Sequence, residues 1–386
     1  MIKRTISERL ISLSKKNPVL TITGPRQSGK TTLAESVFPG YYFISLENPD
    51  NLDFALSNPK GFLKTYGQKI IIDEVQYAPN LFSYIRTIVD KKKRNGLYIL
   101  TGSQNLLLNA EISQSLAGRV INFNLLPFSY NELRNTKYKI NRLSEMIVKG
   151  FYPRIYYSGL KSSDWYPSYI QDYLERDVRK IVNVGNINTF RNFLRICAGR
   201  CGQILNLSSI GNDLGISYQT VKKWLSVLEQ SYIVYLLQPY YKNFNRRVIK
   251  SPKLYFYDTG LVCSLLGIKS PESYELHYLK GNIFETFVIS EILKNKFNTG
   301  SNNELCFWRD SNGNEIDCII SSGLNLKAIE IKAGTKIKSG FTKTLYMWNK
   351  FNVNKNDDLN LIYGGSENQK RNSVKISGWN SLTKVL

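Results

Sequence analysis

The sequence predicts an α/β chain of three parts: a parallel sheet flanked by helices, a helical part, and a second α/β part. Short apolar runs alternate with helical stretches from about Pro18 to Glu132. Residues from about 150 to 260 are mostly helical and end in a hairpin-like pattern, and strands and helices mix again afterwards. Domains usually hold roughly 100–200 residues. We therefore place the parts at 1–145, 146–260 and 261–386 of the 386 residues.

The first part contains short, continuous apolar runs between helical stretches. Such runs are typical of strands that are buried on both faces of a parallel sheet. The predicted strands are Val19–Thr23, Tyr41–Leu46, Ile70–Ile72, Leu97–Leu100 and Val120–Leu125.

A glycine-rich loop follows the first predicted strand. The sequence Gly24-Pro-Arg-Gln-Ser-Gly-Lys-Thr31 fits GxxxxGK[ST] and precedes a helical stretch, which is the context that a P-loop requires. Its backbone N–H groups and the helix N-terminus would bind the phosphates of ATP. Lys30 would reach the β- and γ-phosphates, and the Thr31 hydroxyl would hold Mg²⁺. The expected nucleotide-binding residues here are Gly24, Pro25, Arg26, Gln27, Ser28, Gly29, Lys30, Thr31 and Thr32.

Two carboxylates end the third predicted strand, in Ile70-Ile-Ile-Asp73-Glu74. We expect Asp73 to assist Mg²⁺ binding and Glu74 to polarise the water that attacks the γ-phosphate. A solvated acidic pair is the alternative. The pair follows the P-loop by roughly the interval expected of its partner motif, which favours the catalytic interpretation.

The next predicted strand ends in Thr101-Gly-Ser103-Gln104-Asn105. Ser103, Gln104 and Asn105 are all candidates for the residue that senses the γ-phosphate. Arg119 follows and could stabilise transition-state charge, either within the chain or as an arginine finger. A plain surface arginine is an equally good interpretation of Arg119.

The middle part has the spacing of a helix-turn-helix. A short helix begins at Ser209, and Ser217 caps a second helix, Tyr218–Gln230. The outward side chains of this helix suit phosphates and base edges; they are Tyr218, Gln219, Lys222 and Lys223. A hairpin of Ile233–Leu237 and Lys253–Tyr257 follows. Its connection carries Arg246, Arg247, Lys250 and Lys253, a basic wing. We expect a winged helix that binds DNA, or one that makes protein contacts.

The last part brings carboxylates and a lysine into one pattern. Glu285 lies on a predicted helix, Asp317 precedes an apolar pair, and Glu330 and Lys332 share one face of a strand. Converging carboxylates bind Mg²⁺, and a lysine beside them can activate water for phosphodiester attack. We expect Asp317 and Glu330 as metal ligands, with Glu285 and Lys332 completing a catalytic site. Charged pairs on an exposed strand are the alternative.

Composition restricts the function classes. The formal net charge is +22, which favours a polyanionic partner such as nucleic acid, although a lysine-rich composition alone could produce it. The sequence has a single histidine, His277, which excludes an HExxH zinc site because that motif needs two. Five scattered cysteines indicate free buried thiols. The chain has neither a signal peptide pattern nor a membrane-length apolar run, so we expect a soluble cytoplasmic protein without a membrane partner.

Taken together, these motifs resemble a family of prokaryotic AAA-type ATPases whose C-terminal region was long labelled a domain of unknown function. The resemblance runs nearly end to end. It is carried by Gly24–Thr31, Asp73–Gln76, Thr101–Ser103, Leu116–Val120, Leu126–Phe128, Tyr173–Asp177, Lys250–Lys253, Tyr257–Leu261, Glu285 and Trp308-Arg309. It implies an AAA-like P-loop NTPase core, a winged helix and a restriction-endonuclease-like C-terminal domain, with Glu285, Asp317, Glu330 and Lys332 intact.

Two functions follow from these expectations. The first is a Mg²⁺- and ATP-dependent ATPase that acts on DNA, with a C-terminal domain that cleaves or grips it. The second is an ATP-controlled switch that binds a protein partner through the winged helix and carries an inert nuclease-like fold. The sequence leaves homo-oligomerisation open.

Overall fold

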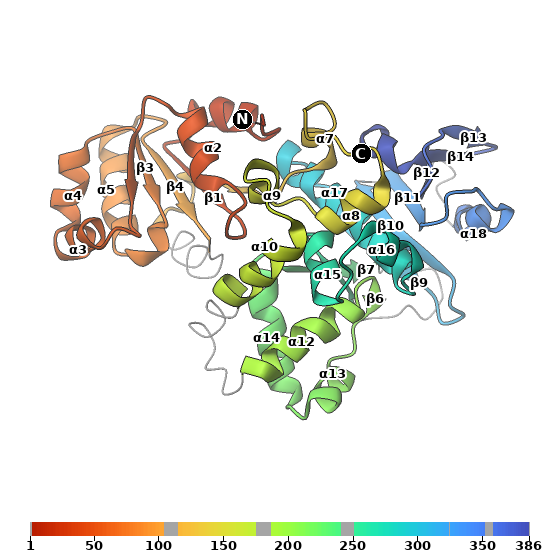
Figure 1. Cartoon of the computed structure of the whole chain (residues 1–386). Coiled ribbons are helices and arrows are strands. Elements are labelled where there is room, and N and C mark those ends of the chain that lie inside the picture. Colours follow the sequence, from red (N-terminus) through yellow and green to blue (C-terminus); the bar gives the residue numbers. More distant parts are fainter. Residues whose placement is uncertain are drawn as a thin grey trace. The chain divides into compact units, whose positions relative to one another are not determined.

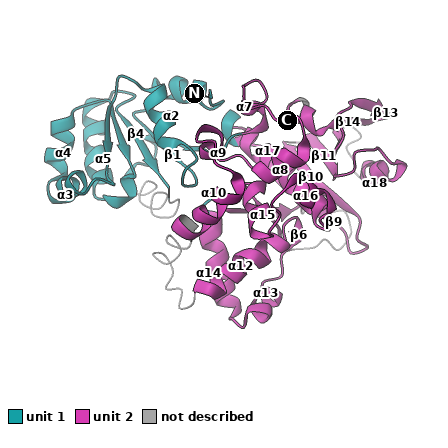
Figure 2. Ribbon diagram, viewed as in Figure 1, with its two compact units in different colours: residues 1–128, 230–232, 297–299 teal, residues 129–229, 233–296, 300–386 magenta. Residues whose placement is uncertain are grey.

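The computed structural model of the protein (Figure 1) describes residues 2–103, 115–174, 187–240, 251–323, 325–351 and 358–385. Contacts between residues divide the chain into two compact units (Figure 2). Unit 1 contains residues 1–128 with 230–232 and 297–299, and unit 2 contains residues 129–229, 233–296 and 300–386. The predicted boundaries at 145 and 260 stay predictions, and we describe each unit by itself.

A five-stranded parallel sheet of order β2-β3-β4-β1-β5 forms the centre of unit 1. Its strands are β1 (Val19–Thr23), β2 (Tyr42–Ser45), β3 (Ile70–Asp73), β4 (Tyr98–Gly102) and β5 (Val120–Asn124). Each strand coincides with one of the five apolar runs, so the α/β class and the parallel sheet are confirmed.

Helices cover both faces of this sheet (Figure 1). They are α1 (Ser7–Ser14), α2 (Lys30–Val37), α3 (Pro49–Ser57), α4 (Pro59–Tyr66) and α5 (Leu81–Lys92), with a short 3₁₀ turn η1 (Val75–Tyr77). Alternate strand residues point to opposite faces. On β3, Ile71 therefore packs in one core with Leu33 of α2, whereas Ile72 packs in the other with Phe62 of α4 and Ile85 of α5. The three central strands, β1, β3 and β4, are buried along their whole length, which explains their mostly apolar sequences, whereas the edge strands β2 and β5 are partly exposed.

Unit 2 is built on a nine-stranded sheet of order β13-β14-β12-β11-β10-β9-β7-β8-β6. The strands are β6 (Gln203–Ile204), β7 (Val234–Pro239), β8 (Lys253–Phe256), β9 (Glu304–Arg309), β10 (Glu315–Ser322), β11 (Asn325–Lys332), β12 (Asp358–Tyr363), β13 (Gln369–Arg371) and β14 (Val374–Gly378). Strands β9, β10 and β11 form an antiparallel meander, and β12 and β14 continue the sheet in parallel with β11. Because β7 pairs with β9, the middle and last parts of the chain share one sheet.

The remaining helices belong to unit 2, except for the last residue of α14 and the last three residues of α17. They are α7 (Tyr130–Leu133), α8 (Leu143–Lys149), α9 (Pro153–Tyr157), α10 (Ser162–Tyr169), η2 (Ile170–Leu174), α12 (Ile187–Gly199), α13 (Leu207–Leu214), α14 (Tyr218–Gln230), α15 (Thr259–Leu265), α16 (Pro271–Leu276), α17 (Lys280–Thr299), η3 (Ser339–Thr342), α18 (Lys343–Phe351) and η4 (Trp379–Lys384). Helix α18 contributes Leu345 and Trp348 to a core with Trp308 and Ile319 of the sheet.

The middle of the chain folds in the order α12, β6, α13, α14, β7, β8, and β8 lies between β6 and β7 in an antiparallel arrangement. Helix α14 begins and ends where the sequence predicted. Gly215 ends α13 in the left-handed conformation (φ 66°), which makes the turn between the two helices. Arg246, Arg247 and Lys250 lie outside the described residues. Lys253 was expected in the exposed basic wing, but this was wrong, because its side chain is only 2% exposed.

All five cysteines are free and buried, as expected. Among the described residues, the longest apolar helical stretch falls short of what crossing a membrane would take.

Candidate functional site

The loop between β1 and α2 is shaped by its glycines. A Cβ on Gly24 would lie 2.1 Å from the carbonyl oxygen of Leu125, and Gly29 has a φ of 91° directly before α2. Both positions therefore require glycine. Arg4, a residue that the sequence analysis missed, donates from its guanidinium to the carbonyls of Ser28 (3.0 Å) and Leu126 (2.6 Å). The loop is thereby fixed at the carboxyl end of β1.

Lys30 and Thr31 open helix α2 beside this loop. The Lys30 Nζ donates to the carbonyl oxygens of Gly24 (3.1 Å) and Pro25 (2.9 Å). The Thr31 hydroxyl donates to Oδ1 of Asp73 (2.9 Å), at the end of β3, and the Thr101 hydroxyl of β4 donates to the same oxygen. Burial raises the pKa of Asp73, and the charge of Glu74 adds to this effect against the two hydroxyls. A threonine hydroxyl beside a buried carboxylate is a donor set that fits Mg²⁺.

Glu74 follows in the left-handed conformation (φ 54°), which turns its carboxylate toward β4. The Ser103 hydroxyl donates to Oε2 of Glu74 (2.9 Å), and the Gln76 amide donates to the same oxygen. Burial acts to raise the pKa of Glu74, but the Lys30 charge and these two hydrogen bonds outweigh it and lower the pKa. Glu74 is therefore held ionised, as a residue that polarises water must be.

Ser103 is the one candidate sensor among the described residues, since Gln104 and Asn105 lie outside them. Its contact with Glu74 connects the end of β4 to the end of β3. In the rest of the expected set, Arg26 lies 3.9 Å from Glu47, Gln27 has a φ of 61°, and Thr32 is exposed on the first turn of α2.

Arg119 lies away from this constellation. It directly precedes β5, which runs parallel to β1 with Val120 opposite Val19. It is therefore at the amino ends of the strands, whereas the P-loop follows their carboxyl ends. Its guanidinium pairs with Asp90 of α5, with Nη2 3.0 Å from Oδ2. A role for Arg119 within its own P-loop does not fit this position, and the arginine-finger and surface interpretations stay open.

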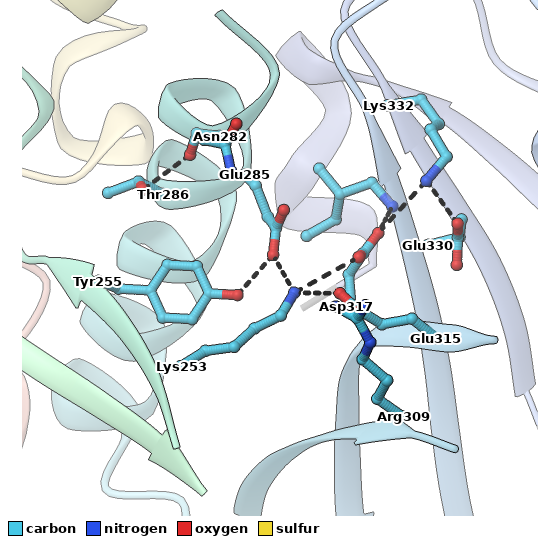
Figure 3. A network of polar contacts seen from close by, with 11 residues as sticks. Lys253, Tyr255, Asn282, Glu285, Thr286, Arg309, Glu315, Asp317, Glu330 and Lys332 are labelled. Carbon is cyan, nitrogen blue, oxygen red and sulfur yellow. Dashed lines mark hydrogen bonds and ion pairs between the residues drawn. The ribbon is translucent and has the colours of Figure 1, made fainter. Parts of the chain in front are cut away.

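A second polar cluster lies in unit 2, where α17, β8, β10 and β11 meet (Figure 3). All four expected residues lie here, and ion pairs of Lys332 link three of them. Lys332 Nζ is 2.5 Å from Oε1 of Glu330 and 3.7 Å from Oδ2 of Asp317. Asp317 Oδ2 also accepts from the backbone N–H of Ile331 (2.7 Å). The alternation rule for β11 therefore placed Glu330 and Lys332 correctly on one face.

Glu285 reaches the other side of Asp317 from α17 (Figure 3). Its Oε1 accepts from the Tyr255 hydroxyl (2.5 Å). One carboxylate oxygen each from Glu285, Glu315 and Asp317 lie within 4.8 Å of one another, close enough to surround a cation. Burial raises the pKa of Glu285 to about 7, with the Asp317 charge contributing and Lys253 opposing. Burial also raises the pKa of Glu330 well above its ordinary value, with the Asp317 charge adding to it.

The sequence analysis missed Glu315 and the position of Lys253. Glu315 stands two residues before Asp317 on β10, so the period of two could have shown that both point the same way. Nothing local identified Lys253 as part of this cluster. Its ammonium, from β8, contacts Glu285 Oε1 (2.8 Å) and Glu315 Oε1 and lies 3.9 Å from Asp317 Oδ1.

Three family profiles match the chain: an AAA domain over residues 16–134, a domain of unknown function (DUF8612) over 140–272, and a domain of unknown function (DUF4143) over 280–382. An uncharacterized protein of Mycobacterium tuberculosis is 28% identical over 331 residues, covering 86% of this chain and 74% of that protein. An uncharacterized protein of Methanocaldococcus jannaschii is 24% identical over 365 residues, covering 86% and 77%.

Two solved structures are similar to parts of the chain. A Walker-type ATPase of Pyrococcus abyssi is 15% identical with a TM-score of 0.47, covering 69% of this chain and 96% of that one. AMPPCP-bound DnaA of Aquifex aeolicus is 15% identical with a TM-score of 0.29, covering 58% and 85%. The P-loop geometry and the AAA domain match together support ATP binding, and the chain carries an AAA-type P-loop ATPase domain in unit 1.

Proposed function

We propose that the protein hydrolyses ATP at the carboxyl edge of the unit 1 sheet and acts on DNA. The observation that carries the ATPase proposal is the convergence of Thr31, Asp73 and Glu74 behind the P-loop, with Ser103 bonded to Glu74. Lys30 and the loop N–H groups would bind the phosphates, while Thr31 and Asp73 would hold Mg²⁺. The bound metal would neutralise charge that develops on the β- and γ-phosphate oxygens.

In this proposal Glu74 orients the attacking water and acts as the general base that accepts a proton from it. Its lowered pKa keeps it able to do so at neutral pH. Ser103 joins Glu74 to β4 and would report the γ-phosphate to the catalytic carboxylate.

The test is nucleotide binding and steady-state hydrolysis in matched variants. Lys30→Ala should remove binding, because the phosphates lose a fixed cation. Glu74→Gln should keep binding and slow hydrolysis by about 10²–10⁴-fold, the usual contribution of a general base. Lys64→Ala, an exposed lysine on α4, should change neither. Full hydrolysis by Glu74→Gln would reassign the base, and full ATP binding by Lys30→Ala would end the assignment of the P-loop.

DNA is proposed as the partner from charge and from the fold of the middle of the chain. The order α12, β6, α13, α14, β7, β8 is the one expected of a winged helix, and the exposed face of α14 presents Tyr218, Gln219, Lys222 and Lys223. Binding should weaken with salt, because each phosphate contact releases counterions. Reversing Lys222 and Lys223 to Glu should lower affinity and reduce the slope of log K against log salt by about 1 per lost contact. The same reversal at Lys91 and Lys92, exposed at the end of α5, is the charge-matched control.

The alternative is an ATP-controlled scaffold that binds a protein partner through the middle of the chain. One observation favours it: the carboxylate cluster that a nuclease would need already holds a lysine ammonium. If reversing Lys222 and Lys223 lowers DNA affinity no more than reversing Lys91 and Lys92 does, the proposed winged helix is assigned to protein contacts.

A metal-dependent nuclease in unit 2 is the second candidate activity. It is supported by the approach of Glu285, Asp317, Glu330 and Lys332 from α17, β10 and β11. Asp317 and Glu330 would be metal ligands, and Lys332 would orient the water. Plasmid cleavage with Mg²⁺ or Mn²⁺, with and without ATP, tests it against Asp317→Asn. Cleavage that survives Asp317→Asn comes from elsewhere or from a contaminant.

A further inference from the structure

Lys253 is buried at the centre of an acidic cluster. Its side chain is 2% exposed, yet it belongs to β8, in the middle of the chain, whereas its partners belong to α17 and β10. In Figure 3 its Nζ points between Glu285 on one side and Glu315 and Asp317 on the other. Buried lysines are rare unless they are paired, and this one contacts three carboxylates.

The oxygens that could bind a metal are the ones that Lys253 occupies. Glu285, Glu315 and Asp317 form the one acidic group with metal-ligand spacing among the described residues. Nζ lies 2.8 Å from Oε1 of Glu285, contacts Oε1 of Glu315, and is 3.9 Å from Oδ1 of Asp317. A divalent ion coordinated by these oxygens at about 2.0–2.6 Å would stand where the ammonium now stands. The two cations therefore exclude each other.

Charge is nearly balanced without a metal. The four carboxylates of Glu285, Glu315, Asp317 and Glu330 face three cations, which are Lys253, Lys332 and Arg309. Arg309 Nη1 is 3.1 Å from Oε2 of Glu315, and Lys332 takes Glu330. With all seven groups ionised, three cations against four carboxylates leave a net charge of −1. A divalent ion added to this set would leave excess positive charge in a buried place, which is costly.

We propose that the Lys253 ammonium is the resident cation of this cluster and that it excludes divalent metal from Glu285, Glu315 and Asp317. The oxygens of these carboxylates are then occupied by the ammonium of a lysine on β8, which precedes them in the chain. The inference shares Asp317 with the metal ligands of the proposed nuclease, so that nuclease could bind its metal through Asp317 only after Lys253 moves away; the inference itself concerns metal binding and not cleavage.

The experiment is a Mn²⁺ titration of the full chain without nucleotide. Binding is measured by isothermal titration calorimetry and, independently, by the loss of the electron paramagnetic resonance signal of free Mn²⁺. Wild type and Asp317→Asn should give the same weak uptake. Lys253→Met should gain one Mn²⁺ equivalent with at least tenfold higher affinity, and Lys253→Met/Asp317→Asn should lose it. The matched control is Lys294→Met, because Lys294 is equally buried (1% exposed) but pairs with the single carboxylate of Glu291 at 2.8 Å. It should gain no Mn²⁺.

Lys253→Met leaves buried carboxylates without their cation, so its folding is measured by circular dichroism in the same series. Folding that depends on Mn²⁺ supports the proposal. The charge-balanced variant Lys253→Met/Glu285→Gln keeps Glu315 and Asp317, and it should still bind Mn²⁺ more tightly than wild type. A folded lysine variant with unchanged Mn²⁺ affinity would overturn the proposal, as would wild-type binding that Asp317→Asn abolishes. Mn²⁺ uptake by Lys253→Met without plasmid cleavage would count against the nuclease and not against the lysine.

Discussion

Replacing Asp73 by Asn should separate the stability of unit 1 from its response to MgATP. The Thr31 and Thr101 hydroxyls both donate to Oδ1, so an amide oxygen can keep both bonds. Burial raises the pKa of the carboxyl, so its contribution to stability is lost as the pH rises through the folded-state pKa. An amide carries no such loss. Without nucleotide, Asp73→Asn should therefore be at least as stable as wild type at pH 7–8.

Asp73→Asn should lose much of the stabilisation that MgATP gives the wild type. A ligand at 100 times its dissociation constant stabilises a protein by about 2.7 kcal/mol. Removing a charged partner of a bonded ligand costs about 1.5–3 kcal/mol, so about 0.3–1.3 kcal/mol of this stabilisation would remain. For a unit of this size, about 1 kcal/mol changes the melting temperature by about 3–5 °C. The wild-type rise of about 10 °C should thus fall to about 1–5 °C in the variant.

The assay is differential scanning calorimetry at a fixed MgATP concentration, repeated with ATP and EDTA. Asp53→Asn, on the exposed side of α3, is the control and should match wild type throughout. A full MgATP shift in Asp73→Asn would show that Asp73 does not hold the metal. A lower melting temperature without nucleotide would show that its charge stabilises the fold, contrary to the reasoning from burial.

Three further predictions follow from the structure. Gly24→Ala should abolish ATP binding, because its Cβ would lie 2.1 Å from the Leu125 carbonyl oxygen, whereas Gly40→Ala, with nothing within 4 Å, should bind as wild type in an equilibrium titration. Asp258→Asn should lower the free energy of unfolding by about 1–3 kcal/mol in denaturant titrations. Its two oxygens accept from the backbone N–H groups of Phe151 (2.8 Å) and Leu261 (3.0 Å), and an amide can serve only one. The five buried thiols, whose pKa values burial raises, should react with a disulfide reagent only when the protein unfolds. A thiol that reacts rapidly in the native protein would contradict their burial.

The parts that the sequence predicted well are those determined by local periodicity. A strand buried on both faces is mostly apolar, so Ile70–Asp73 and Tyr98–Gly102 were recognisable. The P-loop was recognisable because its glycines are required by backbone geometry: a Cβ on Gly24 would clash with the carbonyl oxygen of Leu125. The pairing of Glu330 with Lys332 followed from the period of a strand. None of these inferences needed to know which strands are neighbours.

The parts that the sequence missed depend on tertiary contacts. Lys253 has the local context of an exposed basic hairpin, and only the packing of β8 against α17 and β10 makes it a buried counter-ion. Arg4 reaches the P-loop from a position 24 residues before Ser28, which no spacing rule would indicate. Arg119 was a different kind of miss. Because it precedes its strand, parallel pairing with β1 already places it at the edge opposite the P-loop.

Buried carboxylates in the two units are stabilised by different means, and this difference bears on which unit responds to metal. Asp73 accepts from two neutral hydroxyls, and its pKa is raised, so a divalent ion that supplies charge there improves the electrostatics. Glu285, Glu315 and Asp317 instead share the ammonium of Lys253, so a divalent ion has to displace a charge that the fold supplies. The same cost of burying carboxylates thus favours Mg²⁺ in unit 1 and opposes it in unit 2. On this argument ATP chemistry, and not hydrolysis of nucleic acid, is the activity that Mg²⁺ should control in the wild-type chain.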